Sequence, residues 1–127
     1  MPSRILIVED NASLLYIYKT LLNRSGYEAD GAADGLEGWK AITAKDYDLI
    51  ITDNDMPHLT GLELVSRMRA AYVNVPVILV SGKASKIDKG SIASLGISVL
   101  MGKTEGIPEF LKSIKDVLDL HKNKSVS

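Results

Sequence analysis

Residues able to handle a phosphoryl group follow four separate aliphatic runs in this sequence. The acids Glu9 and Asp10 follow the first run and Asp53 the second, while Ser81 and Lys103 come after the third and fourth. The carboxyl ends of parallel strands share one edge of a sheet, where ligands of open parallel sheets bind. The spacing therefore predicts one site that contains three acids, a hydroxyl group and an amine.

Three carboxylates at one edge would repel one another, by roughly 4 kcal/mol per pair at an effective dielectric constant of 20. Such repulsion raises the pKa of a carboxyl group or recruits a divalent cation. Oxygen ligands without cysteine suit a hard ion, so Mg²⁺ is expected first and Mn²⁺ second. For any single acid, a solvated carboxylate that caps a strand end or a helix is the common alternative.

Asp53 has the best position for a nucleophile, since a carboxylate can attack phosphorus and form an acyl phosphate. Lys103 would neutralise the remaining charge and Ser81 would donate its hydroxyl to a phosphoryl oxygen. Taken alone, Ser81 is a turn residue before Gly82 and Lys103 is a surface amine. Because Ser81 and Lys103 both follow strands that end at the same edge as the acids, a phosphoryl-binding role is favoured over these separate roles.

The 127 residues are 46% hydrophobic and 24% charged, which is typical of one soluble globular domain. A net charge of −1 gives no general attraction for nucleic acid or an anionic membrane. The sequence has no cysteine, which excludes a disulfide framework, a thiolate nucleophile and a cysteine zinc site. The first apolar run stops at two acids and predicts neither a signal peptide nor a membrane span, so we expect a cytoplasmic protein.

Short β-rich runs alternate with helical patterns, which predicts an α/β fold with a doubly wound parallel sheet and helices on both faces. Five strands are expected, at residues 4–8, 27–32, 48–52, 77–80 and 97–101. Gly26 would end the first helix, Asp34 and Thr60 would cap the next two, and Pro108 suits the first turn of the last.

The remaining helix, over residues 85–95, is the weakest of the five predictions. Gly90 stands in its middle and its apolar stripe is thin, so little burial would hold it in place. We expect residues 1–121 to form the domain and residues 122–127 to be a polar tail that frays.

Glu9-Asp10 after the first strand, Asp53-Asn54-Asp55-Met56-Pro57 with Gly61 following, Ser81-Gly82 and Lys103 together resemble the response-regulator receiver domain of two-component signalling. The likeness spans residues 4 to about 120 and rests on ordered spacings. It implies the CheY-like (βα)5 arrangement, a flavodoxin-like sheet of strand order 2-1-3-4-5.

The resemblance implies that Asp53 accepts a phosphoryl group from a sensor histidine kinase, a phosphotransfer protein or a small acyl phosphate. Asp10, Asp53 and the backbone carbonyl of Asp55 would hold Mg²⁺, with Glu9 acting through water. Ser81 and the lysine would bind the phosphoryl oxygens. The protein would then be a phosphoacceptor signalling domain, with at most self-catalysed phosphoryl transfer and autodephosphorylation, and not an enzyme.

Two positions depart from the family pattern. Leu100 stands where an aromatic switch residue is usual, and Thr104 follows the lysine where proline is usual. The switch would therefore run through Ser81, the loop after it and the weak helix. Asp55 and Lys83 flank the site and could pair, and in this family their positions tune the loss of the phosphoryl group.

Phosphorylation would add about −1.5 to −2 charges at the rim and draw the loop after Ser81 toward it. The output face would comprise residues 87–95, residues 98–100 and the last helix, and would bind a downstream protein. We expect a monomer or a phosphorylation-dependent dimer. The sequence shows no effector domain, so the output is either a contact made by this domain or belongs to a longer chain.

Two alternatives stay open. Asp53-x-Asp55 matches the paired aspartates of haloacid-dehalogenase-type Mg²⁺ phosphohydrolases, although there the motif normally follows the first strand and here it follows the third. The second alternative is a receiver-like interaction module that is not phosphorylated, because Leu100 and Thr104 depart from the pattern.

Overall fold

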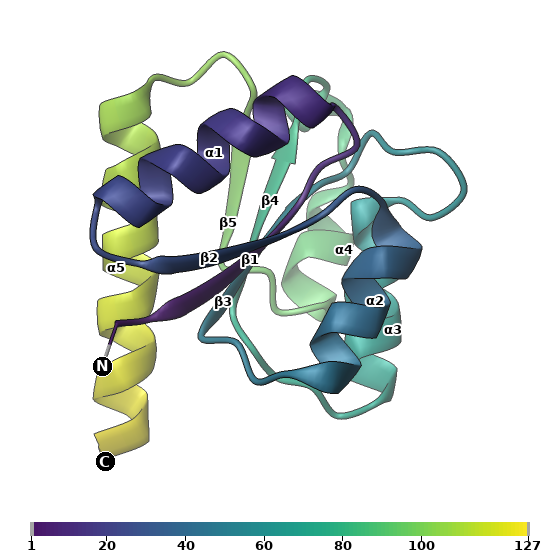
Figure 1. The fold of residues 1–127 in the computed structure, drawn as a ribbon. Coiled ribbons are helices and arrows are strands. Elements are labelled where there is room, and N and C mark those ends of the chain that lie inside the picture. Colours follow the sequence, from purple (N-terminus) through teal and green to yellow (C-terminus); the bar gives the residue numbers. More distant parts are fainter. Residues whose placement is uncertain (1, 127) are drawn as a thin grey trace.

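A parallel five-stranded sheet in the order β2-β1-β3-β4-β5 forms the centre of the molecule (Figure 1). The computed structural model describes residues 2–126 and, for residues 123–126, the helical backbone alone. The strands are β1 (Arg4–Val8), β2 (Glu28–Ala32), β3 (Leu49–Asp53), β4 (Val77–Ser81) and β5 (Val99–Gly102). The predicted α/β fold and its strand order are confirmed.

Helices cover both faces of this sheet, with α1 and α5 on one side and α2, α3 and α4 on the other (Figure 1). Their bounds are α1 (Ala12–Arg24), α2 (Gly35–Ala44), α3 (Gly61–Ala70), α4 (Lys89–Ser94) and α5 (Ile107–Val126), with the short 3₁₀ helix η1 (Ala84–Lys86) before α4. Alternate residues of β1 enter the two cores, Leu6 on the α3 side and Ile7 on the α5 side. Both layers are apolar, which explains why the strands lack polar alternation.

The helix starts follow the local signals in the sequence. The Asp34 side chain accepts from the backbone N–H of Glu37 at the start of α2. At the start of α3, Thr60 and Glu63 form a reciprocal capping box, with distances of 3.1 and 2.9 Å. These caps satisfy backbone donors that the first helical turn leaves free.

Three strands begin later than predicted, and the delays of β2 and β5 have one cause. The N–H of Tyr27 bonds to the carbonyl of Leu22, and the N–H of Ile97 bonds to the carbonyl of Ile92. The N–H groups of Tyr27 and Ile97 thus complete the C-terminal motifs of α1 and α4 and do not bond to a neighbouring strand. The predicted strands 27–32, 48–52 and 97–101 are corrected to Glu28–Ala32, Leu49–Asp53 and Val99–Gly102.

The predicted helix over residues 85–95 is divided into η1 and a six-residue α4. The Asp88 side chain caps α4 by accepting from the N–H groups of Gly90 and Ser91. Gly90 therefore lies in the first turn and not in the middle of the helix. No residue of α4 is buried, so little packing fixes its position.

Helix α5 runs to Val126 and so includes residues that the sequence assigned to a polar tail. The division of the chain after residue 121 stays a prediction. Within residues 2–126, every helix is too short or too polar to cross a membrane.

Two residues after helix α3 ends, a tyrosine takes a backbone conformation that favours glycine. Tyr72 has φ 61°, whereas Gly26 and Gly96 take the corresponding positions after α1 and α4. Because Tyr72 is 88% exposed, little packing offsets the strain. We expect Tyr72→Gly to raise the free energy of unfolding in urea by about 1 kcal/mol, the left-handed penalty less the entropy cost of glycine. Tyr72→Ala is the matched control, and an equal gain there would assign the effect to loss of the exposed ring.

Candidate functional site

Three carboxylates meet at the carboxyl ends of neighbouring strands. Glu9 and Asp10 follow β1, Asp53 ends β3, and the two strands pair in register up to Val8 and Thr52. One ligand oxygen of each acid lies within 4.8 Å of the others. Glu9 and Asp53 are only 2% and 3% exposed, whereas Asp10 faces solvent. The fold thus concentrates negative charge in a partly closed hollow.

Lys103 is the cation that faces these acids. Its Nζ donates to Asp53 Oδ2 at 2.9 Å and lies 3.9 Å from Glu9 Oε1. Its backbone N–H bonds to the carbonyl of Ser81, so the register of β4 and β5 sets its place. Burial would lower the pKa of Lys103, but the hydrogen bond and charge of Asp53, with the charges of Glu9 and Asp55, raise it above the usual value. The amine stays charged at neutral pH.

The surroundings of Glu9 raise the pKa of its carboxyl group. Burial, with the charge of Asp53, raises the pKa of Glu9 to about 7, against an N–H···O bond from Asn11 at 3.0 Å and the charge of Lys103. Among the described ion pairs, Lys103 is the one cation within 4.0 Å of these acids, so three carboxylates share one ammonium group. Three oxygen ligands with excess negative charge fit a hard divalent cation.

The raised pKa makes stability depend on pH. Between pH 4.5 and about 7 the folded protein holds a proton on Glu9 that the unfolded chain has lost, so the free energy of unfolding falls as pH rises through this window. The full fall is on the order of 3 kcal/mol. Urea unfolding in chelator at several pH values measures it, and Glu9→Gln should remove most of the slope. An unchanged slope in that variant would show that another group titrates.

Ser81 is fully buried and its hydroxyl is engaged. Its Oγ donates to the Asp55 carboxylate, 3.1 Å from each oxygen, and accepts from the N–H of Lys83 at 3.0 Å. The N–H of Gly82 donates to Asp55 Oδ2 at 3.0 Å, and the N–H of Asp55 donates to Asp53 Oδ1 at 3.0 Å. Asp55 thus links the acid cluster to the turn after β4.

The predicted pairing of the Asp55 and Lys83 side chains is not found. Among the described residues, the ion pairs within 4.0 Å include none between these two side chains. Asp55 takes the hydroxyl of Ser81 and the N–H of Gly82 in place of an ammonium group. Lys83 enters the site only through its backbone N–H.

The turn that carries Thr104 is closed by a residue that the sequence did not single out. Glu105 Oε2 accepts from the N–H of Gly102 at 2.8 Å, and its own N–H bonds to the Gly102 carbonyl. Thr104 itself is exposed, while Leu100 packs beside the core on the α3 side of the sheet. Their roles in a switch stay predictions.

Asn54 and Gly61 position the loop after Asp53 in ways that the sequence did not reveal. A Cβ on Gly61 would lie 2.6 Å from the Asp53 carbonyl oxygen and 2.8 Å from Leu79 Cδ1, so only glycine lets α3 begin this close to the acid. The Asn54 side chain accepts from the N–H of Leu62 at 3.0 Å. The only signal in the sequence was an amide next to the acid and a glycine before a helix.

The sequence model of the response regulator receiver domain matches residues 5–115. The chain belongs to this receiver family. The polar-differentiation response regulator DivK of Brucella anthropi is 32% identical to this receiver over 120 residues, which is 93% of this chain and 98% of DivK. The transcriptional regulatory protein DltR of Streptococcus agalactiae is 33% identical over 112 residues, which cover 88% of this chain and 50% of DltR. The receiver therefore spans about half the length of that relative.

Solved receiver domains share the fold over nearly the whole chain. A CheY-like receiver from Methanospirillum hungatei has a TM-score of 0.91 at 28% identity and covers 98% of this chain, which covers 99% of it. The response regulator TrrA of Thermotoga maritima, solved in complex with Mg²⁺ and BeF, has a TM-score of 0.82 at 28% identity over 91% of this chain and 98% of its own.

The chain is thus a receiver domain of a two-component system, and receiver domains are signalling domains and not conventional enzymes. Receiver domains bind Mg²⁺ at the acidic pocket and interact with histidine kinases and downstream effectors. The haloacid-dehalogenase alternative loses its support, since the family match includes the acids after β1 as well as the paired aspartates.

Proposed function

We propose that this receiver accepts a phosphoryl group on Asp53 from a histidine kinase or a phosphotransfer protein, with Mg²⁺ at the acidic cluster. The observation that carries the proposal is the setting of Asp53. Its carboxylate is buried among two further acids and receives the Lys103 ammonium at 2.9 Å. A buried carboxylate with an adjacent cation and an acidic metal set has the parts that phosphoryl transfer to aspartate needs.

Each group of the site has a distinct task in this proposal. Asp10, Asp53 and the Asp55 backbone carbonyl would hold Mg²⁺, and Glu9 would act through water. The ion supplies charge neutralisation on the phosphoryl oxygens. A carboxylate oxygen of Asp53 forms the new bond to phosphorus as the bond from phosphorus to the donor imidazole breaks, and the imidazole leaves with the bonding electron pair. Lys103 would then pair with a phosphoryl oxygen.

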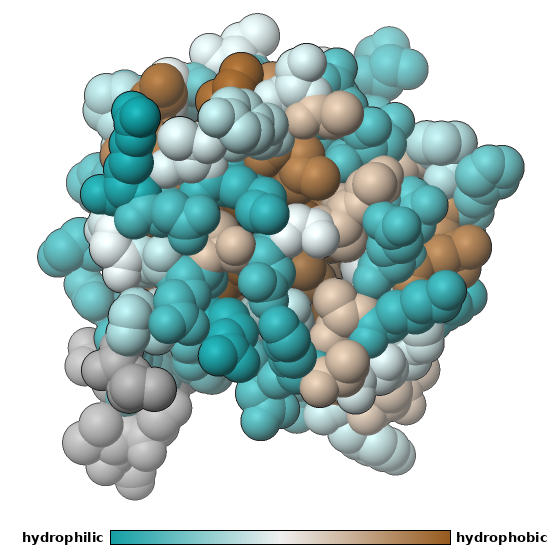
Figure 2. Space-filling view, in the orientation of Figure 1, coloured by the Kyte–Doolittle hydropathy of each residue, from teal (hydrophilic) through white to brown (hydrophobic). Residues whose placement is uncertain are grey.

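The surface beside Lys103 suits a protein donor. A phosphohistidine has to reach Asp53 at the carboxyl rim, so the residues around that rim face the donor. Ile17 of α1 and Ile107 of α5 are 52% and 56% exposed and line a small pocket together with Lys103. Figure 2 shows a largely hydrophilic surface with apolar patches near α1 and the loop leading into α5. We propose that the donor covers these side chains.

The output in this proposal is a shift of the turn after Ser81 and of α4, read by a downstream protein on the face of α4, β5 and α5. The absence of fully buried residues in α4 supports it, because a helix with only one partly buried core contact, Ile92, moves at small cost. The domain would act in the cytoplasm as a monomer or as a phosphorylation-dependent dimer. It would make no direct contact with nucleic acid or membrane.

Intact-mass measurement after incubation with acetyl phosphate and Mg²⁺ tests the acceptor. The wild-type chain should gain one phosphoryl group, and neither the Asp53→Ala variant nor a chelator-treated sample should gain it. Refusal of the label by folded wild-type protein with Mg²⁺ present would instead support the interaction module that is not phosphorylated. Repeated turnover of a simple phosphomonoester would revive the phosphohydrolase alternative.

A further inference from the structure

We infer that the Asp55 side chain is a positioning residue that holds the Ser81 hydroxyl, and that it sets how readily Ser81 turns to a phosphoryl group on Asp53. The inference deepens the proposed function and rests on it for its second half. Its first half, the hold on Ser81, is a property of the protein without phosphate.

The hydroxyl proton of Ser81 already takes part in a hydrogen bond. The buried hydroxyl has a single proton, which is directed at the Asp55 carboxylate with both oxygens at 3.1 Å. Its lone pairs receive the N–H of Lys83 at 3.0 Å. A phosphoryl oxygen accepts hydrogen bonds and cannot donate when ionised. Ser81 can therefore bind it only by giving up Asp55.

Asp55 also holds the backbone of the same turn. The N–H of Gly82 donates to Asp55 Oδ2 at 3.0 Å, so one exposed carboxylate fixes two consecutive residues. Hydrogen bonds to an ionised acceptor are about twice as strong as neutral ones. The strand ends themselves are fixed, since β3 and β4 pair up to Asp53 and Val80. Any movement at this edge has to take place in the loops that Asp55 joins.

The turn continues directly into the loosely held part of the fold. The N–H of Lys86 bonds to the carbonyl of Lys83 within η1, and α4 follows without a buried residue. Release of Ser81 by Asp55 would thus free the turn, η1 and the start of α4 together. The Asp55 carboxylate and a phosphoryl oxygen would compete for the one proton of Ser81. The strength of the bond to Asp55 would therefore set the fraction of molecules in which the turn has moved.

A double-mutant cycle with Mg²⁺ and beryllofluoride tests the inference. The four proteins are wild type, Asp55→Ala, Ser81→Ala and the double variant, and amide NMR signals of residues 82–95 follow the titration. Asp55→Ala should lower the half-saturating beryllofluoride concentration about tenfold more in wild type than in the Ser81→Ala background, because a charge-assisted hydrogen bond to Ser81 is lost. The change within the Ser81→Ala background measures the effect of the Asp55 charge alone. Equal changes in both backgrounds would overturn the inference.

Hydrogen exchange without metal or beryllofluoride separates the two proposals. The Lys83 amide bonds to Ser81 and not to Asp55, so Asp55→Ala should speed its exchange about tenfold only if Asp55 orients the hydroxyl. Asp55→Asn keeps an acceptor and should give a smaller change. Unchanged exchange at Lys83 would refute the hold on Ser81. Failure of wild type to respond to beryllofluoride, with fast exchange in Asp55→Ala, would refute phosphoryl acceptance and leave the hold standing.

Discussion

Lys103→Met should lower the free energy of unfolding by about 2–3 kcal/mol at pH 7.5 in chelator, because removal of one partner leaves buried charge unpaired. The Lys103 ammonium lies 2.9 Å from Asp53 and 3.9 Å from Glu9, both almost fully buried. The loss should shrink below pH 6, since Glu9, with a pKa of about 7, is then protonated and no longer needs a cation. Urea unfolding at pH 5.5 and 7.5 measures both values.

The chain offers a matched control for this variant. Lys112 pairs with Asp116 at the same distance of 2.9 Å, but its side chain is 78% exposed. Lys112→Met should therefore cost no more than about 0.5 kcal/mol and show no dependence on pH in this range. Similar losses in the free energy of unfolding of the two variants would mean that burial of the acids does not determine how much the Lys103 ion pairs stabilise the protein.

The strands and the site were predictable because both follow from strong local signals. Long apolar runs mark strands covered on both faces, and the parallel sheet then places every residue that follows a strand at one rim. Asp53 and Lys103 are fifty positions apart, yet their side chains meet because β3, β4 and β5 are adjacent. The prediction that these two side chains lie close together required the strand order alone and no knowledge of side-chain contacts.

The features that the sequence did not predict depend on which of several nearby donors or acceptors a residue bonds to. Tyr27 and Ile97 look like strand residues but complete helix ends, because backbone pairing in a C-terminal motif has no apolar signature. Asp55 could have paired with Lys83 and instead takes Ser81 and Gly82. Sequence spacing does not distinguish an ammonium partner from a nearby hydroxyl and N–H.

Arg67 and Arg69 of α3 also show that the sequence does not reveal which partner a side chain takes. Arg67 lies on the surface with its guanidinium 5.7 Å from the centre of the Trp39 ring. Arg69 turns inward and binds the backbone, donating from Nε to Leu95 O at 2.7 Å and from Nη1 to Val73 O and Val75 O at 2.8 and 2.9 Å. Burial lowers the pKa of Arg69. Nothing in the sequence marks one of these arginines as structural.

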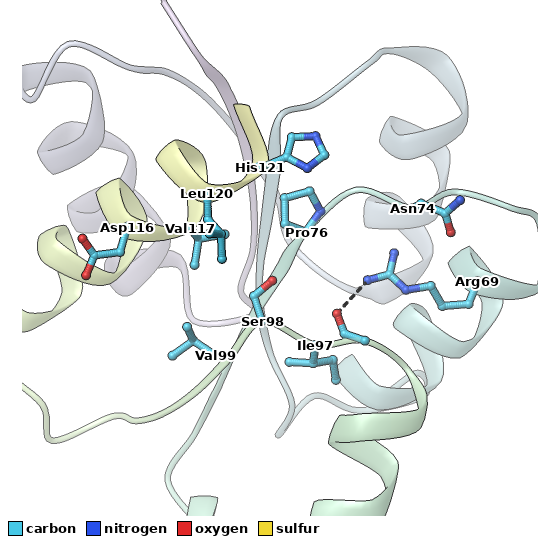
Figure 3. Close-up of a pocket in the computed structure, with 11 residues that line it drawn as sticks. Arg69, Asn74, Pro76, Ile97, Ser98, Val99, Asp116, Val117, Leu120 and His121 are labelled. Carbon is cyan, nitrogen blue, oxygen red and sulfur yellow. Dashed lines mark hydrogen bonds between the residues drawn. The ribbon is translucent and has the colours of Figure 1, made fainter. Parts of the chain in front are cut away.

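Arg69 joins three segments at the end of the sheet opposite the acids. Its Nη2 lies 3.4 Å from Gly96 O, the bond drawn in Figure 3 at the edge of a cavity of about 700 Å³ that Ile97 and Leu120 also line. The guanidinium thus connects α3 to the chain before β4 and to the end of α4. Because α4 contributes no fully buried residue and only Ile92 and the following Leu95 pack against the core, the bonds from Arg69 add to a sparse attachment.

Arg69→Met should lower the free energy of unfolding by about 3 kcal/mol, since it removes three short hydrogen bonds and one long one and leaves half-buried carbonyls without donors. Arg67→Met removes the same charge two residues away and should cost less than about 1 kcal/mol. Amide exchange of residues 92–97 should also quicken in the Arg69 variant alone, because the end of α4 loses its tie to α3. Equal stability of the two variants, with unchanged exchange at α4, would show that water replaces the guanidinium without cost.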